Sequence, residues 1–264
     1  MKEFLNVINA SIEAGLEILK IYNTDDFGVS YKEGDMPLTK ADLAANAIIQ
    51  EVLETTHIPI ISEENKAIDF TTRKEWGRCW IVDPLDGTKE FIKRNGDFTV
   101  NIALIENGKP VFGVIYVPVS QELYMGDVLA NTSYKVQTTT AFTSFEDLNK
   151  KYKEIHPSQG SDVIKIVGSK SHMNETTQQF VDDLKKTSNK EVEIVSRGSS
   201  LKFCLVASGE AQMYPRFAPT MEWDTAAGQA ICEAVGLKVI DQTTQEPMRY
   251  NRENLLNPYF LVTS

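Results

Sequence analysis

The segment WIVDPLDGT at residues 80–88 restricts what this chain can fold into more than any other stretch of the sequence. Its first residues form a short apolar run, which predicts a buried strand that ends at Asp83. A proline then turns the chain, Asp86 follows three residues after Asp83, and Gly87 and Thr88 lead into a predicted helix start. Two carboxylates on one tight turn repel each other unless a cation lies between them.

The ligands on this turn favour a magnesium site. Carboxylate oxygens suit Mg²⁺, which binds proteins through carboxylates and substrate phosphates. The helix start behind them offers free backbone N–H groups to a phosphate. The alternative is a strand-to-helix turn whose aspartates only cap the helix. We favour the metal site because DPLDGT combines several separate requirements in one turn.

Further carboxylates follow other predicted elements. Glu63 and Glu64 come after the apolar run IPII, and Asp224 precedes an apolar helix in EWDTAAG. Taken alone, the glutamates fit a solvated loop and Asp224 fits a helix N-cap. No histidine has the spacing of a zinc ligand, so carboxylates are the available ligands. Glu63, Asp83, Asp86 and Asp224 are therefore predicted to hold two or three Mg²⁺ ions.

Such a site activates water, because two metal ions lower the pKa of a bound water and bind both oxygens of an in-line displacement. Thr88 is placed to orient that water through its hydroxyl, and Asp42 to hold Thr88 by accepting its hydrogen bond. The alternative for Asp42 is a capping box with Thr39 at the start of a helix over 39–56. The sequence alone favours the capping box.

Composition excludes several classes of function. The net charge of −10 and the absence of a basic run argue against nucleic acid as a partner. An anionic substrate would then require a cation to invert the local field. The three cysteines have no framework spacing, which indicates reduced thiols in a cytoplasmic protein. No signal peptide or transmembrane stretch is predicted, while peripheral contact with the inner membrane and the oligomeric state are left open.

The order of predicted elements indicates an α/β protein in two halves. Residues 1–130 carry helices over 3–22 and 39–56, short strands before Glu63 and Asp83, and a hairpin over 97–118 that turns at Asn107-Gly108. Residues 131–160 form a polar, irregular connection. Residues 161–264 alternate strands and helices. The predicted elements there are strands over 163–167, 192–195 and 211–214, helices over 175–186, 199–208 and 224–235, and a final strand pair.

These motifs resemble the inositol monophosphatase superfamily of metal-dependent, lithium-sensitive phosphatases. WIVDPLDGT, the WDTAAG of residues 223–228 and the SEE of residues 62–64 occur in the order typical of that superfamily. Three further segments resemble the bacterial 3′(2′),5′-bisphosphate nucleotidases within it: DGTKEFIKRNG at 86–96, GSSLKFC at 198–204 and YPRF at 214–217. The resemblance implies a layered αβαβα sandwich with the active site between the halves.

The resemblance also implies roles for individual residues. The first metal would be held by Glu63, Asp83 and the Leu85 carbonyl, and the second by Asp83, Asp86 and Asp224. Glu63 would also lie near a third, water-rich site, and acts with Thr88 and Asp42 as a catalytic residue. The N–H groups of Gly87 and Thr88 would bind the scissile phosphate. The nucleoside and its other phosphate would be surrounded by Ser171, His172, Ser199, Lys202 and Arg216.

The predicted reaction is the Mg²⁺-dependent hydrolysis of adenosine 3′,5′-bisphosphate to AMP and phosphate. A substrate with two phosphates requires positive charge at the phosphate that is not cleaved, and Lys202 and Arg216 are candidates for it. The residues alone also allow a snorkelling lysine, a surface arginine and a loop histidine at position 172. The sequence leaves open the choice between this substrate and its 5′-phosphosulfate relative. The alternatives are an inositol-phosphate or sugar-bisphosphate phosphatase and, more remotely, a non-catalytic nucleotide-binding regulator.

Overall fold

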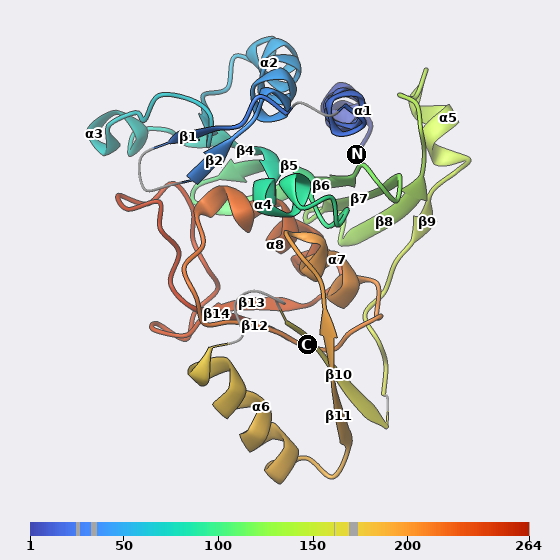
Figure 1. The fold of residues 1–264 in the computed structure, drawn as a ribbon, viewed down its shortest axis with the longest axis vertical. Helices are drawn as coiled ribbons and strands as arrows, with labels where there is room; N and C mark the ends of the chain where they lie inside the picture. The colour runs from blue at the N-terminus through green and yellow to red at the C-terminus, as the bar shows by residue number, and fades with distance from the viewer. Residues whose placement is uncertain (25–26, 33–35, 161, 169–173, 264) are drawn as a thin grey trace.

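The fold is a stack of alternating helical and sheet layers, as predicted (Figure 1). A computed structural model describes residues 1–264 except 25–26, 33–35, 161, 169–173 and 264. The outer helical layer holds α1 (Leu5–Tyr22) and α2 (Lys40–Glu54), and it covers one face of a seven-stranded sheet. Helices α7 (Leu201–Ala207) and α8 (Ala226–Glu233) cover the other face, and a three-stranded sheet and then α6 (Glu175–Thr187) lie beyond them.

The central sheet is antiparallel except where β3 pairs with β4. Its strands follow the order β3 (Ile60–Ser62), β4 (Arg78–Asp86), β5 (Thr99–Glu106), β6 (Lys109–Val117), β7 (Glu122–Asp127), β8 (Thr132–Gln137) and β9 (Lys153–Glu154). The β5–β6 turn confirms the predicted hairpin: Asn107 has a φ of 50° and Gly108 a φ of 75°. Positive φ at both residues is what a two-residue hairpin turn requires.

The prediction of an irregular connection over residues 131–160 was wrong for β8 and β9, which extend the sheet to Glu154. The segment also contains a short helix, α5 (Phe145–Asn149). Strand β8 escaped prediction because it buries few apolar side chains: Ser133 is fully buried and donates a hydrogen bond to the Ile231 carbonyl oxygen at 2.8 Å. The division of the chain into halves around this segment stays a prediction.

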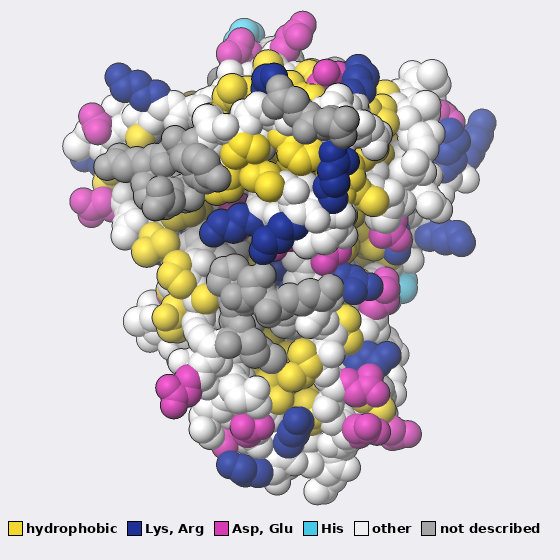
Figure 2. Space-filling model, viewed as in Figure 1, with side chains coloured by type: hydrophobic (Ala, Val, Ile, Leu, Met, Phe, Trp, Pro, Cys, Tyr) yellow, Lys and Arg dark blue, Asp and Glu magenta, His cyan; other side chains and the backbone are white. Residues whose placement is uncertain are grey.

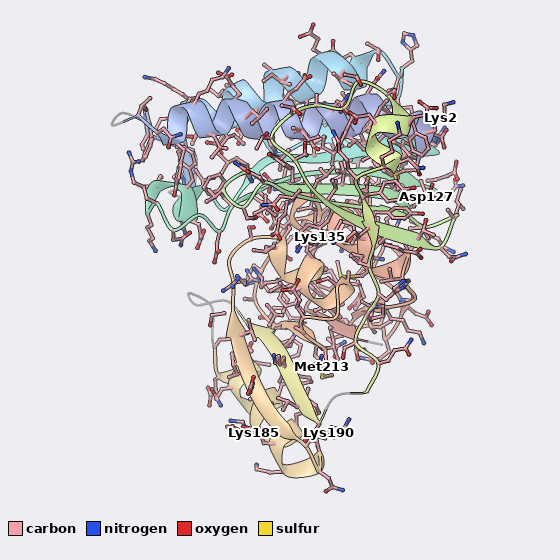
Figure 3. All side chains as sticks on the ribbon, turned by 90° about the vertical axis from the view of Figure 1, so that its right-hand side faces the viewer. Lys2, Asp127, Lys135, Lys185, Lys190 and Met213 are labelled. Atoms are coloured by element: carbon pink, nitrogen blue, oxygen red, sulfur yellow. The ribbon has the colours of Figure 1, made fainter. Side chains whose placement is uncertain are left out.

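The second half alternates strands and helices as expected. The parallel strands β10 and β11 pair beside α6, away from α1 and α2 (Figure 3). The strand predicted over 211–214 begins later, at Tyr214, while Met213 forms an isolated parallel bridge to Ile166. The sheets of this half contain β10 (Val163–Gly168) and β11 (Glu191–Ser196), and β12 (Tyr214–Arg216), β14 (Phe260–Thr263) and β13 (Lys238–Asp241).

The remaining short elements lie around the layers. They are η1 (Lys2–Phe4), the paired strands β1 (Ser30–Lys32) and β2 (Met36–Leu38), α3 (Phe70–Arg73), α4 (Thr88–Ile92) and η2 (Glu222–Asp224). In the described part of the chain, no helix is both long enough and apolar enough to cross a membrane.

Buried apolar side chains form one core on each face of the central sheet, and β4 contributes to both. Successive side chains of the strand point to opposite faces of the sheet, so Trp80 packs on the side of α1 and α2 and Ile81 on the side of α7 and α8. Helix α8 lies very close to the sheet at Gly113, where an added Cβ would lie 2.4 Å from the Ala227 carbonyl oxygen. This close packing brings the start of α8 to the end of β4, where the acidic residues lie.

Candidate active site

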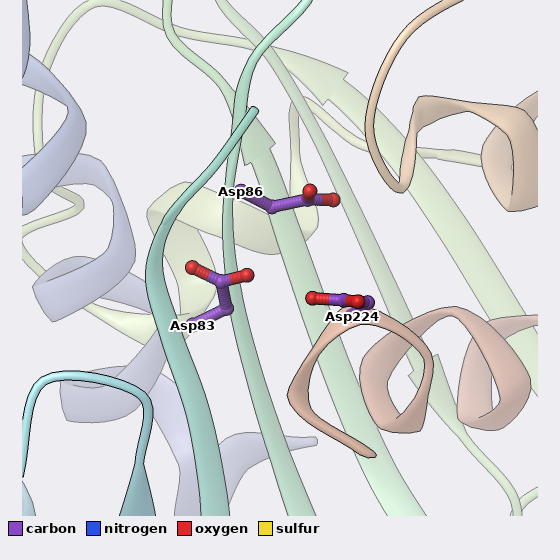
Figure 4. A group of neighbouring side chains, drawn as sticks. All are labelled: Asp83, Asp86 and Asp224. Atoms are coloured by element: carbon purple, nitrogen blue, oxygen red, sulfur yellow. The ribbon is translucent and has the colours of Figure 1, made fainter. Parts of the chain in front are cut away.

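Three aspartates from two elements face one another at the end of β4 (Figure 4). Strand β4 supplies Asp83 and Asp86, and the register of its pairing with β5 shifts between them. The turn η2, directly before α8, supplies Asp224. One ligand oxygen from each carboxylate lies within 4.8 Å of the others, so the structure brings together three of the predicted metal ligands.

Backbone N–H groups anchor these carboxylates and leave oxygens free to face the centre. Asp83 Oδ1 accepts from the Leu85 N–H at 3.1 Å, and Asp224 Oδ2 accepts from the Met221 N–H at 2.7 Å. Asp83 Oδ2 is buried and has no hydrogen-bond partner within the described ranges. A buried carboxylate oxygen normally has a partner, so this atom indicates that a cation belongs there.

The charges in the cluster are also unbalanced. Burial, followed by repulsion from Glu63 and Asp86, raises the pKa of Asp83 well above its usual value. Burial and then the Asp86 charge raise the pKa of Asp224 to about 8. Both shifts record the cost of burying several carboxylates together without a counter-charge. The number, type and burial of these oxygen donors fit Mg²⁺, because a bound divalent cation would remove that cost.

Asp42 performs both of the roles that the sequence offered as alternatives. Its Oδ2 accepts from the Thr39 N–H at 2.7 Å and from the Thr39 hydroxyl at 2.5 Å, which forms the capping box of α2. Its Oδ1 accepts from the Thr88 hydroxyl at 3.1 Å. Because that hydroxyl has one proton, donation to Asp42 leaves its lone pairs directed to other donors.

The other predicted residues near the metal centre lie close by, with roles that stay predictions. The charge of Glu63 helps to raise the pKa of both Asp83 and Asp224, which places its carboxylate near them. The Leu85 carbonyl oxygen lies 3.4 Å from the Thr88 hydroxyl oxygen. Gly87 has a φ of 96°, a conformation that favours glycine, at the N-cap of the five-residue helix α4.

A pocket joins this acidic cluster to two cationic side chains. Lys202 is only 4% exposed, and its Nζ donates to the Ser199 carbonyl oxygen at 2.5 Å and lies 5.4 Å from the centre of the Tyr214 ring. Burial lowers the pKa of Lys202 to about 8, and the nearby charge of Arg216 contributes in the same direction. The pocket is lined by Asp86, Gly87, Glu90, Gly198, Ser199, Lys202, Tyr214, Arg216, Thr220, Asp224 and Thr225.

Arg216 shows that this end of the pocket is suited to an anion. Its Nε is buried and lacks a hydrogen-bond partner within the described ranges, while another guanidinium nitrogen donates to the Pro219 carbonyl oxygen at 3.1 Å. A buried lysine beside an arginine with an unsatisfied N–H has the donors and charge that phosphate or sulfate requires. The interpretation of Lys202 as a snorkelling lysine is wrong, because Lys202 is buried. Arg216 is partly exposed and lines the same pocket, so its predicted contact with substrate stays a prediction.

Ser199 also lines this pocket, and its predicted contact with substrate stays a prediction. It has a φ of 41° and its hydroxyl donates to Thr99 Oγ1 at 3.2 Å. Ser171 and His172 lie outside the described residues, so their predicted contacts with substrate stay predictions.

Figure 2 shows Lys and Arg side chains gathered in the middle of the face on which Figure 1 places α4. Helix α4 and the two residues that follow it carry Lys89, Lys93 and Arg94. Arg94 has a structural role, because it donates to the Tyr22 carbonyl oxygen at 2.8 Å and lies 4.7 Å from the centre of the Phe27 ring. The arginine in FIKRNG therefore fixes the segment after α1 and does not line the pocket.

Two polar residues beside the aspartates were not predicted from the sequence. Ser200 donates to Asp86 Oδ2 through its N–H at 2.6 Å, and Asn101 Nδ2 donates to the Ser200 hydroxyl at 2.9 Å. Ser200 lies inside GSSLKFC, so that motif was a signal for its position. The Asn101 position follows from the pairing of β5 with β4 opposite Asp83, which the sequence did not show.

Comparisons with known proteins agree with this architecture. The model of the inositol monophosphatase family matches residues 1–261. The chain is 42% identical over 253 residues to the 3′(2′),5′-bisphosphate nucleotidase CysQ of Salmonella typhimurium, with 95% of each chain covered. It is 41% identical over 254 residues to the protein of the same name from Escherichia coli K12, again with 95% of each covered.

Solved structures give the same result. The crystal structure of CysQ from Bacteroides thetaiotaomicron superimposes with a TM-score of 0.90 at 46% identity, covering 99% of this chain and 97% of the other. The inositol monophosphatase of Thermotoga maritima superimposes with a TM-score of 0.74 at 20% identity, covering 100% and 92%. The second match concerns the fold alone.

Proposed function

This chain belongs to the inositol monophosphatase family, and on that premise we propose that it hydrolyses the 3′-phosphate of adenosine 3′,5′-bisphosphate, giving AMP and phosphate. The observation that carries the proposal is a pair of buried, unsatisfied atoms of opposite polarity, one in the aspartate cluster and one in the pocket that this cluster adjoins. Among the described residues, Asp83 Oδ2 in the cluster lacks a donor and Arg216 Nε in the pocket wall lacks an acceptor. A metal ion would bind the Asp83 oxygen, and the second phosphate of a nucleotide that has two phosphates would accept from the Arg216 N–H. The names of the relatives with 95% coverage support the same substrate.

The metal in this proposal is Mg²⁺, held by Asp83, Asp86 and Asp224 with Glu63 and the Leu85 carbonyl in addition. The fit rests on three neighbouring carboxylates and on the buried Asp83 oxygen that has no partner within the described ranges. Bound there, the metal supplies Lewis-acid stabilisation of the phosphoryl oxygens and a water of lowered pKa.

Thr88 and Asp42 orient the nucleophile in this proposal. The Thr88 hydroxyl donates to Asp42 Oδ1, so its lone pairs accept a hydrogen bond from the attacking water and fix its direction. Water forms the new bond to phosphorus as the bond to the 3′-oxygen breaks. The departing 3′-oxygen keeps the bonding electrons and takes up a proton.

Lys202 and Arg216 bind the 5′-phosphate, which is not cleaved. They line the wall of the pocket beyond the aspartates, and neither has a carboxylate ion pair in the described part of the chain. The metal site cannot serve both phosphates, so these cations select a substrate with a second anionic group. A 5′-phosphosulfate satisfies the same pair, whereas inositol 1-phosphate leaves it unsatisfied.

The proposed setting is the cytoplasm, where thiols stay reduced. Cys79, Cys204 and Cys232 are all buried and free. Burial raises the pKa of the Cys79 thiol to about 12. The thiols are therefore structural and have no part in the proposed chemistry.

The test is phosphate release with Mg²⁺ from adenosine 3′,5′-bisphosphate, inositol 1-phosphate and fructose 1,6-bisphosphate in parallel. We expect strong preference for the nucleotide and loss of activity when the metal is chelated. Preference for the inositol or sugar phosphate would keep the metal chemistry and reject the substrate. No release from any of the three would reject the proposed activity.

A further inference from the structure

Ser200 lies at the junction of the two elements that supply the metal ligands. Its side chain is buried, at 2% exposure, directly before α7. Its Oγ lies 2.7 Å from Asp86 Oδ2 and 2.6 Å from the Asp224 backbone carbonyl oxygen. No other described side chain contacts both of these aspartates through hydrogen bonds. One hydroxyl therefore joins the end of β4 to the turn before α8.

The ordinary role of a serine at this position does not explain the contacts. An N-cap serine normally accepts a hydrogen bond from an N–H in the first turn of its helix. Ser200 makes no such side-chain cap, and its backbone is already helical, with a φ of −71° and a ψ of −5°. Its hydroxyl is directed away from the helix that it precedes and toward the acidic cluster.

The Ser200 hydroxyl has one proton and two lone pairs, and its neighbours use them fully. Asn101 Nδ2 donates to Ser200 Oγ at 2.9 Å and occupies one lone pair. The single proton then serves Asp86 Oδ2 and the Asp224 carbonyl oxygen, which are both acceptors at hydrogen-bond distance. The hydroxyl is thus fixed on three sides.

As a consequence, the two carboxylate oxygens of Asp86 have different roles. Oδ2 accepts from the Ser200 N–H at 2.6 Å and from the Ser200 hydroxyl, and Asn101 Nδ2 lies 3.4 Å away. These donors fix the carboxylate and leave Oδ1 as the oxygen for an ion. Groups behind a ligand that hold it in this way commonly control metal affinity.

We propose that Ser200 is a positioning residue for the metal site, which fixes Asp86 and Asp224 relative to each other and ties both to the start of α7. That helix carries Lys202 in its first turn, so the same residue sets the spacing between the metal site and the cationic end of the pocket. The inference rests on the metal site of the proposed function and is independent of which phosphate ester is cleaved.

The test is a titration of the wild-type protein and of Ser200→Ala with Mn²⁺ in the absence of substrate. The electron paramagnetic resonance signal of the free ion measures how much Mn²⁺ stays unbound. We expect Mn²⁺ affinity to fall about 10-fold, the lower end of the 10–100-fold range for such outer groups, because the Ser200 N–H still holds Asp86. The turnover that Ser200→Ala loses at limiting Mg²⁺ should be partly restored by excess Mg²⁺, because the ligands themselves remain.

Ser133→Ala is the matched control, because Ser133 is also fully buried and bonds a carbonyl oxygen of another element at 2.8 Å. With chelator present, the two variants should melt at similar temperatures, and only Ser200→Ala should lose Mn²⁺ affinity. Asn101→Ala is a second variant: it frees the Ser200 hydroxyl, so it should weaken Mn²⁺ binding by a smaller factor in the same direction.

Unchanged Mn²⁺ affinity in both Ser200→Ala and Asn101→Ala would overturn the inference, as would an equal loss in Ser133→Ala. Failure of the wild-type protein to bind Mn²⁺ would reject the proposed metal site itself and the inference with it. Normal Mn²⁺ binding without turnover of the nucleotide would reject only the proposed substrate, and the Ser200 comparison would still decide the inference.

Discussion

The two ends of the pocket differ in charge but share one property. Among the described residues, Asp83 Oδ2, in the aspartate cluster beside the acidic end, is buried without a hydrogen-bond partner, and Arg216 Nε at the basic end is in the same condition. Within the described ranges these are the only two buried side-chain atoms of this kind. Folded proteins pair nearly all such atoms. One exception lies in the aspartate cluster and the other in the wall of the pocket that the cluster adjoins, which favours a ligand that brings both a cation and an anion.

The two ends also differ in how firmly the protein holds them. Backbone N–H groups anchor Asp83, Asp86 and Asp224 at 2.6–3.1 Å. The Lys202 ammonium, by contrast, has a neighbouring carbonyl oxygen and an aromatic face as its described partners. A fixed ligand set suits chemistry, which requires accurate placement. In the proposed function the basic end supplies charge for substrate recognition, and this difference predicts which kinetic constant each substitution changes.

The largest expected effect comes from Asp83→Asn at the acidic end. The change removes a buried ligand oxygen and its charge, so turnover of adenosine 3′,5′-bisphosphate should fall below detection. The fold should persist, because the variant relieves repulsion from Glu63 and Asp86. Phosphate release and thermal melting with chelator check both parts, with Asp183→Asn on the exposed face of α6 as the control. Near-normal turnover would show that the metal site is assigned wrongly.

The next effect concerns Thr88, which belongs to the same end. Thr88→Val keeps the shape and removes the hydroxyl that Asp42 orients. We expect kcat to fall by about 10²–10⁴-fold, the usual contribution of a positioned proton-transfer group, with little change in KM. Thr88→Ser keeps the hydroxyl and should retain most activity. Equal activity in the valine and serine variants would exclude this role.

A smaller effect, on KM and not on kcat, is expected from Arg216→Gln at the basic end. Losing a charge-assisted hydrogen bond costs about 1.5–3 kcal/mol, so KM for the bisphosphate should rise about 10–100-fold while kcat changes little. Arg78→Gln, which alters an exposed arginine on β4, serves as the control. A fall in kcat with unchanged KM would mean that Arg216 acts on the chemistry instead.

The smallest effect is a dependence on pH. Burial lowers the pKa of Lys202 to about 8, so the ammonium of the free enzyme loses its proton as the pH rises past that value. Because the protonated form binds the anion, kcat/KM for the bisphosphate should decline above about pH 8. Lys202→Arg should remove this decline, since arginine stays protonated. An unchanged profile in that variant would assign the decline to another group.

Local patterns in the sequence were sufficient to predict most elements and the acidic end. The apolar run before Asp83 predicted a strand, Asn107-Gly108 predicted a hairpin, and the residues after Asp224 predicted a helix. For Asp42 the sequence offered two roles as alternatives. The structure contains both, because one carboxylate has two oxygens and each makes a different contact.

What the sequence did not show depends on contacts between distant segments. Strand β8 is polar, and it belongs to the sheet through pairing with β7 and the bond from Ser133 to α8. The contact between Ser200 and Asp86 joins residues 114 positions apart. It exists only because α7 packs at the end of β4, and neither segment specifies that packing alone.

The measurement that tests the two-ended pocket most directly is kcat/KM for adenosine 3′,5′-bisphosphate compared with adenosine 3′-monophosphate, which lacks the second phosphate. The wild-type protein should prefer the bisphosphate by at least about 10–100-fold, the value of one or more charge-assisted bonds. In the double variant Lys202→Met/Arg216→Gln, the ratio of kcat/KM for the bisphosphate to kcat/KM for the monophosphate should fall close to one, because the second phosphate loses its binding partners. Equal kcat/KM for the two nucleotides in the wild-type protein would contradict the account.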